Sequence, residues 1–252
     1  MRSKIRSYFL RLGKTNLILT DLVRCKGEEI DKIDEFEFAS AGMLSIDEND
    51  EVDHTIKAEI NHQVKLFIQN KYYTVRLLSS ALVFLALYLF CSLVIRDPIP
   101  MIDELAIATA GAIGLWLYMN KREGNGAYAV KIRLDLEELY HNKSNLQLEF
   151  LEKLEAYLYD LNSRYDSLTL CDILAKNEKE VLLPELKIET SSEAESFKVL
   201  LADYLKHHSS LSSLYKRIKA NDRADKQLAA TLINAEMRGE NLLLLALCVV
   251  LL

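Results

Sequence analysis

A long apolar stretch interrupted by a short polar turn is the feature that most constrains how this chain folds. Residues 77–95 contain no charged residue, and residues 105–119 form a second uncharged run. A bilayer core about 30 Å thick needs about 20 apolar residues in a helix that rises 1.5 Å per residue. The second run reaches that length only with Met101 and Ile102 included. We therefore expect a transmembrane helical hairpin with spans at 77–95 and 101–119; a buried pair of helices in a soluble core is the alternative.

Two prolines mark the turn of this expected hairpin. Pro98 and Pro100 lie between the runs, and proline ends one helix and starts the next because its φ is fixed and its N–H is missing. Asp103 and Glu104 follow in the first turn of the second helix, where the helix dipole favours negative charge. In an oligomer these two carboxylates would form a ring at the mouth of a pore.

Small residues recur on the second helix. Ala106, Ala110 and Gly114 are spaced four residues apart, and Gly111 lies beside them. Small residues at this spacing let helices approach closely in lipid. We expect the stripe either to close the hairpin or to pack one protomer against another.

Basic and aromatic residues flank the hairpin and predict its orientation. The membrane anchors that we expect are Tyr72, Tyr73, Arg76, Lys121 and Arg122. The turn has only Arg96, whereas both outer flanks are rich in lysine and arginine. The protein is therefore expected to be an integral protein of the plasma or inner membrane with both termini cytoplasmic.

The segments before the hairpin alternate in charge. Residues 1–26 combine basic side chains with an apolar face of Ile5, Tyr8, Phe9 and Leu12, which predicts an amphipathic helix that lies on anionic lipid or packs on the cytosolic domain. Residues 27–51 are strongly acidic and are expected to form a solvated linker. From residue 52 the chain lacks Gly and Pro up to the first span, and Ile56, Ile60, Val64 and Phe67 form an apolar stripe at helical spacing. Residues 52–123 are therefore expected to comprise a stalk helix and the hairpin.

Residues 127–252 are expected to form a cytosolic helical domain. Residues 127–139 suit a short strand or a helix, and we favour the helix; leucines at three- and four-residue spacing predict another helix at 145–165. Ser192 and Glu195 resemble a capping box. The apolar end, residues 242–252, is too short to span a bilayer, so we expect it to be buried in the bundle, to dip into the inner leaflet, or to form an oligomer contact.

The sequence lacks the motifs of the common catalytic and cofactor sites. We find no Walker loop, HExxH, GxSxG or Rossmann fingerprint. The four cysteines lack zinc spacing, and the net charge of −6 argues against a nucleic-acid partner. The prediction is therefore that the chain has no catalytic residue, cofactor or metal.

These features together predict an all-α integral membrane protein with a two-helix hairpin, a long stalk helix and a C-terminal helical bundle. The function that we expect is a membrane-anchored interaction or scaffold protein, whose partners are the lipid bilayer and either further copies of itself or a cytosolic protein. An oligomeric pore-forming or membrane-perturbing effector is the first alternative. A membrane-tethered enzyme is the second.

Overall fold

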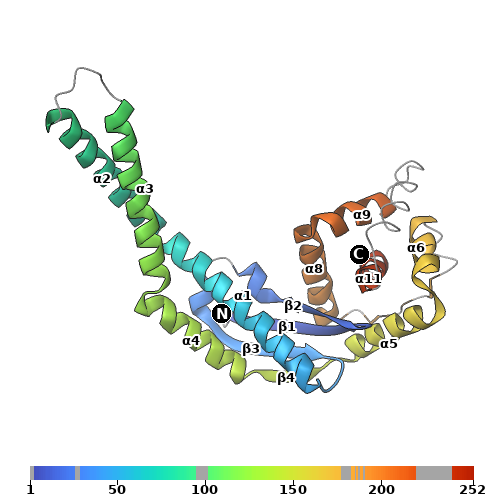
Figure 1. The fold of residues 1–252 in the computed structure, drawn as a ribbon. Helices are drawn as coiled ribbons and strands as arrows, with labels where there is room; N and C mark the ends of the chain where they lie inside the picture. Colours follow the sequence, from blue (N-terminus) through green and yellow to red (C-terminus); the bar gives the residue numbers. More distant parts are fainter. Residues whose placement is uncertain are drawn as a thin grey trace. The chain divides into compact units, whose positions relative to one another are not determined.

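The computed structural model describes residues 3–25, 29–94, 102–176, 183–184, 186, 188–189, 191–219 and 240–252 (Figure 1). The chain divides into two compact units whose segments alternate along the sequence. We call one the arm unit, which comprises Met1–Lys4, Leu22–Glu35 and Ile56–Asn142. The other is the sheet unit, which comprises Ile5–Asp21, Phe36–Thr55 and Lys143–Leu252.

A four-stranded sheet shows that the prediction of an all-α fold is wrong. Its strands are β1 (Ser3–Leu12), β2 (Thr15–Thr20), β3 (Ile33–Ser40) and β4 (Ser144–Gln147), in the order β2-β1-β3-β4. β1 and β2 are antiparallel, with Ser7 opposite Thr20 and Leu12 opposite Thr15. β3 and β4 are parallel, with Glu37 opposite Ser144. The fold is therefore mixed, although most of it is helical.

The amphipathic helix expected over residues 1–26 is replaced by the β1–β2 hairpin. Gly13 occupies the turn with a φ of +71°, a conformation that L-residues rarely adopt. Tyr8, Leu10 and Leu12 alternate along β1 into the main core, and Phe9, between them, is buried as well. Burial on both faces of the strand explains the error, because the apolar residues then occur at helical as well as alternating spacing.

The expected acidic linker over residues 27–51 also contains regular structure. Short 3-10 helices η1 (Asp21–Arg24) and η2 (Ile30–Lys32) precede β3, and α1 begins at Ile46. Within β3, Phe36 and Phe38 are buried and so is Glu37, which accepts a 2.8 Å hydrogen bond from Arg6 Nε. The acidic composition hid a strand because this carboxylate is paired with arginine rather than solvated.

The expected stalk is divided into two helices. α1 (Ile46–Lys71) is followed after Tyr72 by α2 (Tyr73–Val94), and the bonds Tyr72 N to Ile68 O (3.2 Å) and Arg76 N to Tyr72 O (3.0 Å) continue the helical pattern through the join. α1 begins earlier than residue 52 because Ser45 and Glu48 form a reciprocal capping box. The apolar stripe that predicted the helix is buried, as expected: Ile56, Ile60, Val64 and Phe67.

The arm unit continues with α3 (Ile102–Gly124) and α4 (Ala127–His141), so the helical prediction for residues 127–139 is confirmed. α2 and α3 lie side by side (Figure 1). Their directions are opposite, since Arg76 at the start of α2 is ion-paired with Glu123 at the end of α3. Pro98 and Pro100 lie outside the described residues.

Only one described helix is long and apolar enough to cross a membrane, so the prediction of a two-span hairpin is wrong. That helix is Tyr73–Leu93, within α2. α3 falls short because it carries charged residues in its first turn, Asp103 and Glu104, and in its last turn, Lys121 and Arg122. These charges limit its uncharged stretch to residues 105–120.

The sheet unit contains the main core. Its helices are α5 (Glu149–Arg164), α6 (Ser167–Lys176), α8 (Ser192–His207), α9 (Ser209–Lys219) and α11 (Glu240–Leu251). α11 contacts the other four and is buried from Leu242 to Val249, which agrees with the first of the three alternatives for the apolar end, a helix buried in the bundle. The α5 leucines expected to form an apolar face are buried too: Leu151, Leu154, Leu158 and Leu161. The cap of α8 is Ser191, one residue earlier than predicted.

Candidate functional site

α2 and α3 approach each other closely at Gly111, and the interface between them is partly polar. On α2 its most buried residues are Arg76, Ser80 and Cys91, and on α3 the most buried is Ala108. Gly111 lets the helices approach, because an added Cβ would lie closer to Leu87 Cδ1 than real Cβ atoms come to any neighbour. Close packing at a glycine is typical of helix pairs in lipid.

Most of the predicted small-residue stripe lies away from this interface. Of its four members, Gly111 contacts α2, whereas Ala106, Ala110 and Gly114 are exposed. A Cβ at Gly114 would meet no atom within 4 Å. The sequence missed Ala108 as an interface residue, although it lies three residues before Gly111 on the same helical face.

The remaining surface of the pair is apolar and exposed. In the most apolar 18-residue stretch of the helix Tyr73–Leu93, 17% is buried within the structure. The large exposed side chains on α2 include Leu77, Leu78, Leu82, Leu85, Leu89, Phe90 and Leu93, and those on α3 include Leu105, Ile107, Ile113 and Leu117. Exposed apolar side chains in such number are costly in water and are typical of surfaces that contact a membrane or a partner.

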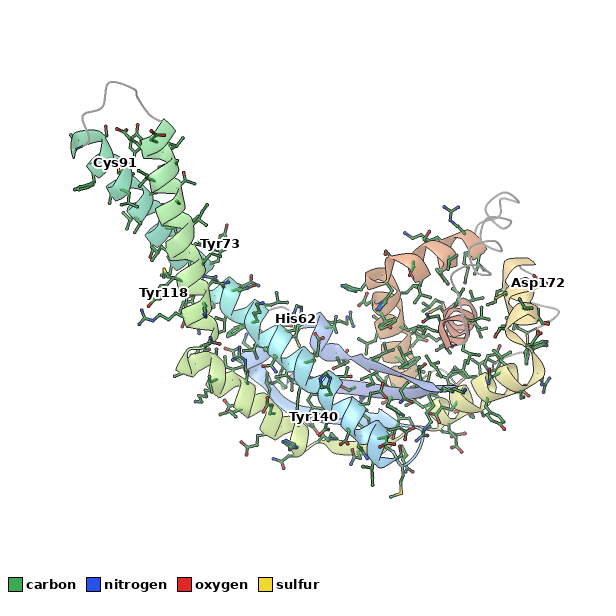
Figure 2. The ribbon with its side chains drawn as sticks, viewed as in Figure 1. His62, Tyr73, Cys91, Tyr118, Tyr140 and Asp172 are labelled. Atoms are coloured by element: carbon green, nitrogen blue, oxygen red, sulfur yellow. The ribbon has the colours of Figure 1, made fainter. Side chains whose placement is uncertain are left out.

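Aromatic side chains gather at one end of the pair, where α2 begins and α3 approaches its end. Figure 2 shows Tyr73 and Tyr118 in this region and Cys91 toward the other end of α2. Tyr73 packs edge to face on Trp116, with ring centroids 5.6 Å apart, and both Tyr73 and Tyr118 are exposed. Tyrosine and tryptophan are enriched at the boundary between a bilayer and water.

A buried arginine joins the helices at the same end. Arg76 is 2% exposed; its Nε lies 3.1 Å from Glu123 Oε2, and its Nη1 donates a 2.6 Å hydrogen bond to Asn120 Oδ1. Its Nη2 donates to the carbonyl oxygen of Gln69, and its guanidinium carbon lies 5.3 Å from the Trp116 ring centroid. The Nε and Oε2 atoms form an ion pair without the alignment of a hydrogen bond. Such a cluster holds the join of α1 and α2 against the end of α3.

The predicted anchors and pore residues occupy different environments. Lys121, Arg122 and Tyr73 are exposed and Tyr72 is half-buried, whereas Arg76 faces the interior of the helix pair rather than its outer surface. Asp103 is exposed and Glu104 half-buried, in the first turn of α3.

Residues of the arm unit line three open hollows. The first, of about 290 Å³, is formed by α1, α3 and the start of α4. The second, of about 350 Å³, is formed by Tyr72, the end of α3 and the start of α4. The third, of about 240 Å³, is formed by η2, the start of β3 and α4. The first contains Lys65, Lys121 and Arg133 and no carboxylate. The others each include at least one acidic residue, Glu123 in the second and Asp31 and Asp135 in the third.

Charged groups in the sheet unit form structural networks. The Arg11 guanidinium donates two hydrogen bonds to Glu48, of 2.5 and 3.0 Å, and one of 3.2 Å to Glu155. The Arg11 backbone N–H donates a further 3.0 Å hydrogen bond to Glu155. The Arg11 guanidinium is the main reason that the pKa of Glu48 falls to about 2. Burial raises the pKa of Tyr8, whose hydroxyl donates a 3.2 Å hydrogen bond to the carbonyl oxygen of Glu193. These contacts tie β1 to α1, α5 and α8.

Metal-ligating side chains and histidines are the remaining candidates for a chemical site among the described residues. No group of three or more His, Cys, Asp or Glu side chains suited to a metal occurs among them. The rings of His207 and His208 lie within hydrogen-bond distance of backbone carbonyls one turn earlier in α8. In comparisons with known proteins, no family model, curated protein or solved structure matches this chain.

Proposed function

We propose that this chain is a membrane-anchored interaction protein, in which α2 enters the bilayer and the sheet unit is presented at its surface. The observation that carries the proposal is the exposed apolar surface of α2, a helix long enough to cross a bilayer. At 1.5 Å per residue, the 21 residues of Tyr73–Leu93 extend about 32 Å, close to the thickness of a hydrocarbon core. α3 packs antiparallel to α2 and enters the bilayer with it, so the chain returns to the side from which α2 entered. The uncharged stretch of α3, residues 105–120, is too short for α3 to be a span of its own.

Two other kinds of helix share this length and composition, and α2 differs from both. A core helix of a soluble protein is mostly buried, whereas only 17% of the most apolar 18-residue stretch of this helix is buried. A signal sequence precedes the folded part of a protein, whereas α2 follows three strands of the sheet and α1. Neither alternative accounts for its position and exposure.

The energetic argument favours lipid over water. Each large apolar side chain gains about 1.5–3 kcal/mol on leaving water. The exposed leucines and Phe90 of α2 therefore gain on the order of 10 kcal/mol in a bilayer. This gain is comparable with the whole free energy of unfolding of a typical domain, about 5–15 kcal/mol.

The orientation that we propose has both termini on the cytoplasmic side. Because Arg76 is ion-paired with Glu123, the chain enters and leaves the α2–α3 pair at the same end. Basic residues are concentrated there, with Lys71 before α2 and Lys121 and Arg122 at the end of α3. Positive charge near a membrane helix favours the cytoplasmic side.

The interaction role belongs to the sheet unit in this proposal. It has its own extensive core, which joins the sheet to α5, α6, α8, α9 and α11. A module with its own core can stay folded in water while α2 occupies the bilayer. Its partner is proposed to be a cytosolic protein.

A second candidate function, self-association into a pore or membrane-perturbing assembly, has one specific observation in its favour. Ala106, Ala110 and Gly114 remain exposed on α3 after the pair has formed, which leaves a close-packing surface for another copy. Asp103 and Glu104 would lie at one end of such an assembly. The mass of the detergent-purified protein, after subtraction of bound detergent, tests it: a ring of about five or more copies supports a pore, whereas a monomer or dimer excludes one.

Flotation with liposomes after alkaline extraction tests the anchor. We expect the full chain to float, and the double variant Leu82→Lys/Leu85→Lys to be extracted, because a charged residue at the centre of a span costs about 2.5–3.5 kcal/mol. Leu168→Lys is the matched control, since Leu168 is 69% exposed on the sheet unit and Leu82 is 70% exposed. Release of the unmodified chain into the soluble fraction would refute the proposal.

A further inference from the structure

The hollow formed by α1, α3 and the start of α4 differs from the other two in its charge. It is lined by three cations, Lys65, Lys121 and Arg133, and by three amides, Gln69, Asn120 and Asn125. The rest of its lining is Ile68, Leu117 and Gly124. Among the described residues, the lining therefore combines positive charge, amide groups and apolar side chains, and includes no acidic side chain.

The cations of this hollow lack acidic partners within the described part of the chain. Lys65 and Lys121 are exposed and have no carboxylate within ion-pair distance there. Arg133 donates a 2.9 Å hydrogen bond from Nη2 to the carbonyl oxygen of Gly124, the last residue of α3, and its buried Nε has no hydrogen-bond partner. A carbonyl orients the guanidinium but does not neutralise its charge.

Arg76 orients the side-chain amide of Asn120. Because Asn120 Oδ1 accepts the 2.6 Å hydrogen bond from Arg76 Nη1, the free side of this amide is its Nδ2 donor group. The carbonyl oxygen of Gln69 likewise accepts from Arg76 Nη2. The buried arginine thus fixes a donor at the edge of a cationic hollow.

We propose that this hollow binds a phosphoryl group, the chemistry shared by anionic phospholipid headgroups and free phosphate. Lysine and arginine cations and amide donors are the groups that recognise phosphate in proteins. The hollow lies at the aromatic end of the helix pair, where headgroups would be if α2 enters a bilayer, and Leu117 and Ile68 would contact the start of an acyl chain. Assignment to a lipid rests on the proposed membrane anchoring, whereas phosphoryl binding does not.

The test is a titration of the detergent-purified full chain, followed by the fluorescence of Trp116. This residue is the single tryptophan, and Arg76 lies between its ring and Asn120. The probes are short-chain phosphatidylglycerol, short-chain phosphatidylcholine and inorganic phosphate. We expect saturable binding of phosphatidylglycerol, weaker binding of phosphatidylcholine because its choline is cationic, and weakest binding of phosphate alone.

Two double variants separate the hollow from general positive charge. Lys65→Gln/Lys121→Gln removes two cations of the hollow and should weaken phosphatidylglycerol binding about 25-fold, at about fivefold for each charge. Arg122→Gln/Lys131→Gln removes two exposed cations that do not line it and should weaken binding less than about threefold, because neither side chain would contact the bound phosphoryl group and salt screens charges that act at a distance. Circular dichroism checks that both variants remain folded.

The outcomes distinguish this inference from the anchor itself. Equal binding of phosphatidylglycerol and phosphatidylcholine, equal weakening by the two variants, or no saturable binding would overturn the phosphoryl site even if the protein floats with liposomes. Binding of inorganic phosphate as tight as that of the lipid, with the same dependence on Lys65 and Lys121, would assign the site to a soluble phosphate. Loss of flotation with phosphatidylglycerol binding retained would refute the anchor alone.

Discussion

The contact between Gly111 and Leu87 offers the sharpest test of the α2–α3 packing. Replacing a helical glycine with alanine normally stabilises a helix by about 0.5–1 kcal/mol. At Gly111 the new methyl group would displace Leu87 Cδ1, and overpacking of this kind costs about 1–3 kcal/mol. Because the displaced atom is the end of a side chain, we expect Gly111→Ala to be destabilising by up to about 2 kcal/mol once the helix gain is included.

Gly114→Ala is the matched control, because its added methyl group meets no atom within 4 Å. We expect this variant to be as stable as the unmodified protein or slightly more stable, so the two alanine variants should differ by about 1–3 kcal/mol. For a chain of this size that difference corresponds to about 2–4 °C in Tm for each kcal/mol. The measurement is thermal unfolding in detergent, followed by Trp116 fluorescence and by circular dichroism.

A double-mutant cycle with Leu87→Ala completes the experiment. Removing the Leu87 side chain should abolish the penalty at Gly111, so the double variant should be less destabilised than the sum of the single variants by about 1–3 kcal/mol. Equal stability of Gly111→Ala and Gly114→Ala, or strict additivity in the cycle, would refute the close approach of the helices at Gly111.

Three further predictions concern charge and backbone conformation. Arg11 is the main reason that the pKa of Glu48 is about 2, below its ordinary value of 4.5. The ionised carboxylate therefore stabilises the folded state above pH 4.5, and this stabilisation is lost as the pH falls from 4.5 to about 2. Glu48→Gln should cost about 1 kcal/mol at pH 7 and nothing at pH 2, as measured by urea unfolding. Arg76→Leu leaves the buried Oε2 atom of Glu123 without its ion-pair partner and should lower stability by about 3–5 kcal/mol. A second change, Glu123→Gln, should recover part of that loss in the same thermal assay. Gly13→Val forces a β-branched residue to a φ of +71°, which should lower the free energy of unfolding by about 1–3 kcal/mol and therefore lower Tm. An unchanged Tm would contradict the assigned turn.

Regular patterns of burial on one face could be predicted from the sequence. The stripe of Ile56, Ile60 and Val64 and the leucines of α5 are buried as their spacing indicates. These helices have one apolar face and one solvated face, so the helical period is visible in the order of residues. The apolar length of α2 could be read for the same reason, since it depends on composition alone.

The candidate site was only partly predictable. Arg76 and Asn120 meet because α3 returns along α2, a contact between residues 44 positions apart. Arg76 has the spacing of a surface anchor, and only its neighbours on another helix place it inside the pair. The cations of the hollow formed by α1, α3 and the start of α4 likewise come from three helices, so no local sequence motif identifies them.

The apolar length of α2, the polar character of both ends of α3 and the amphipathic faces of α1 and α5 follow from the order of residues alone. The strand β1 follows only from its packing, because it is buried on both sides and its residues fit two periodicities equally well. Packing also explains why Glu37 lies in a strand, since the partner that stabilises this buried carboxylate is Arg6, on β1. Local order is encoded by spacing along one element, whereas burial on two faces and buried charge depend on which other elements pack there.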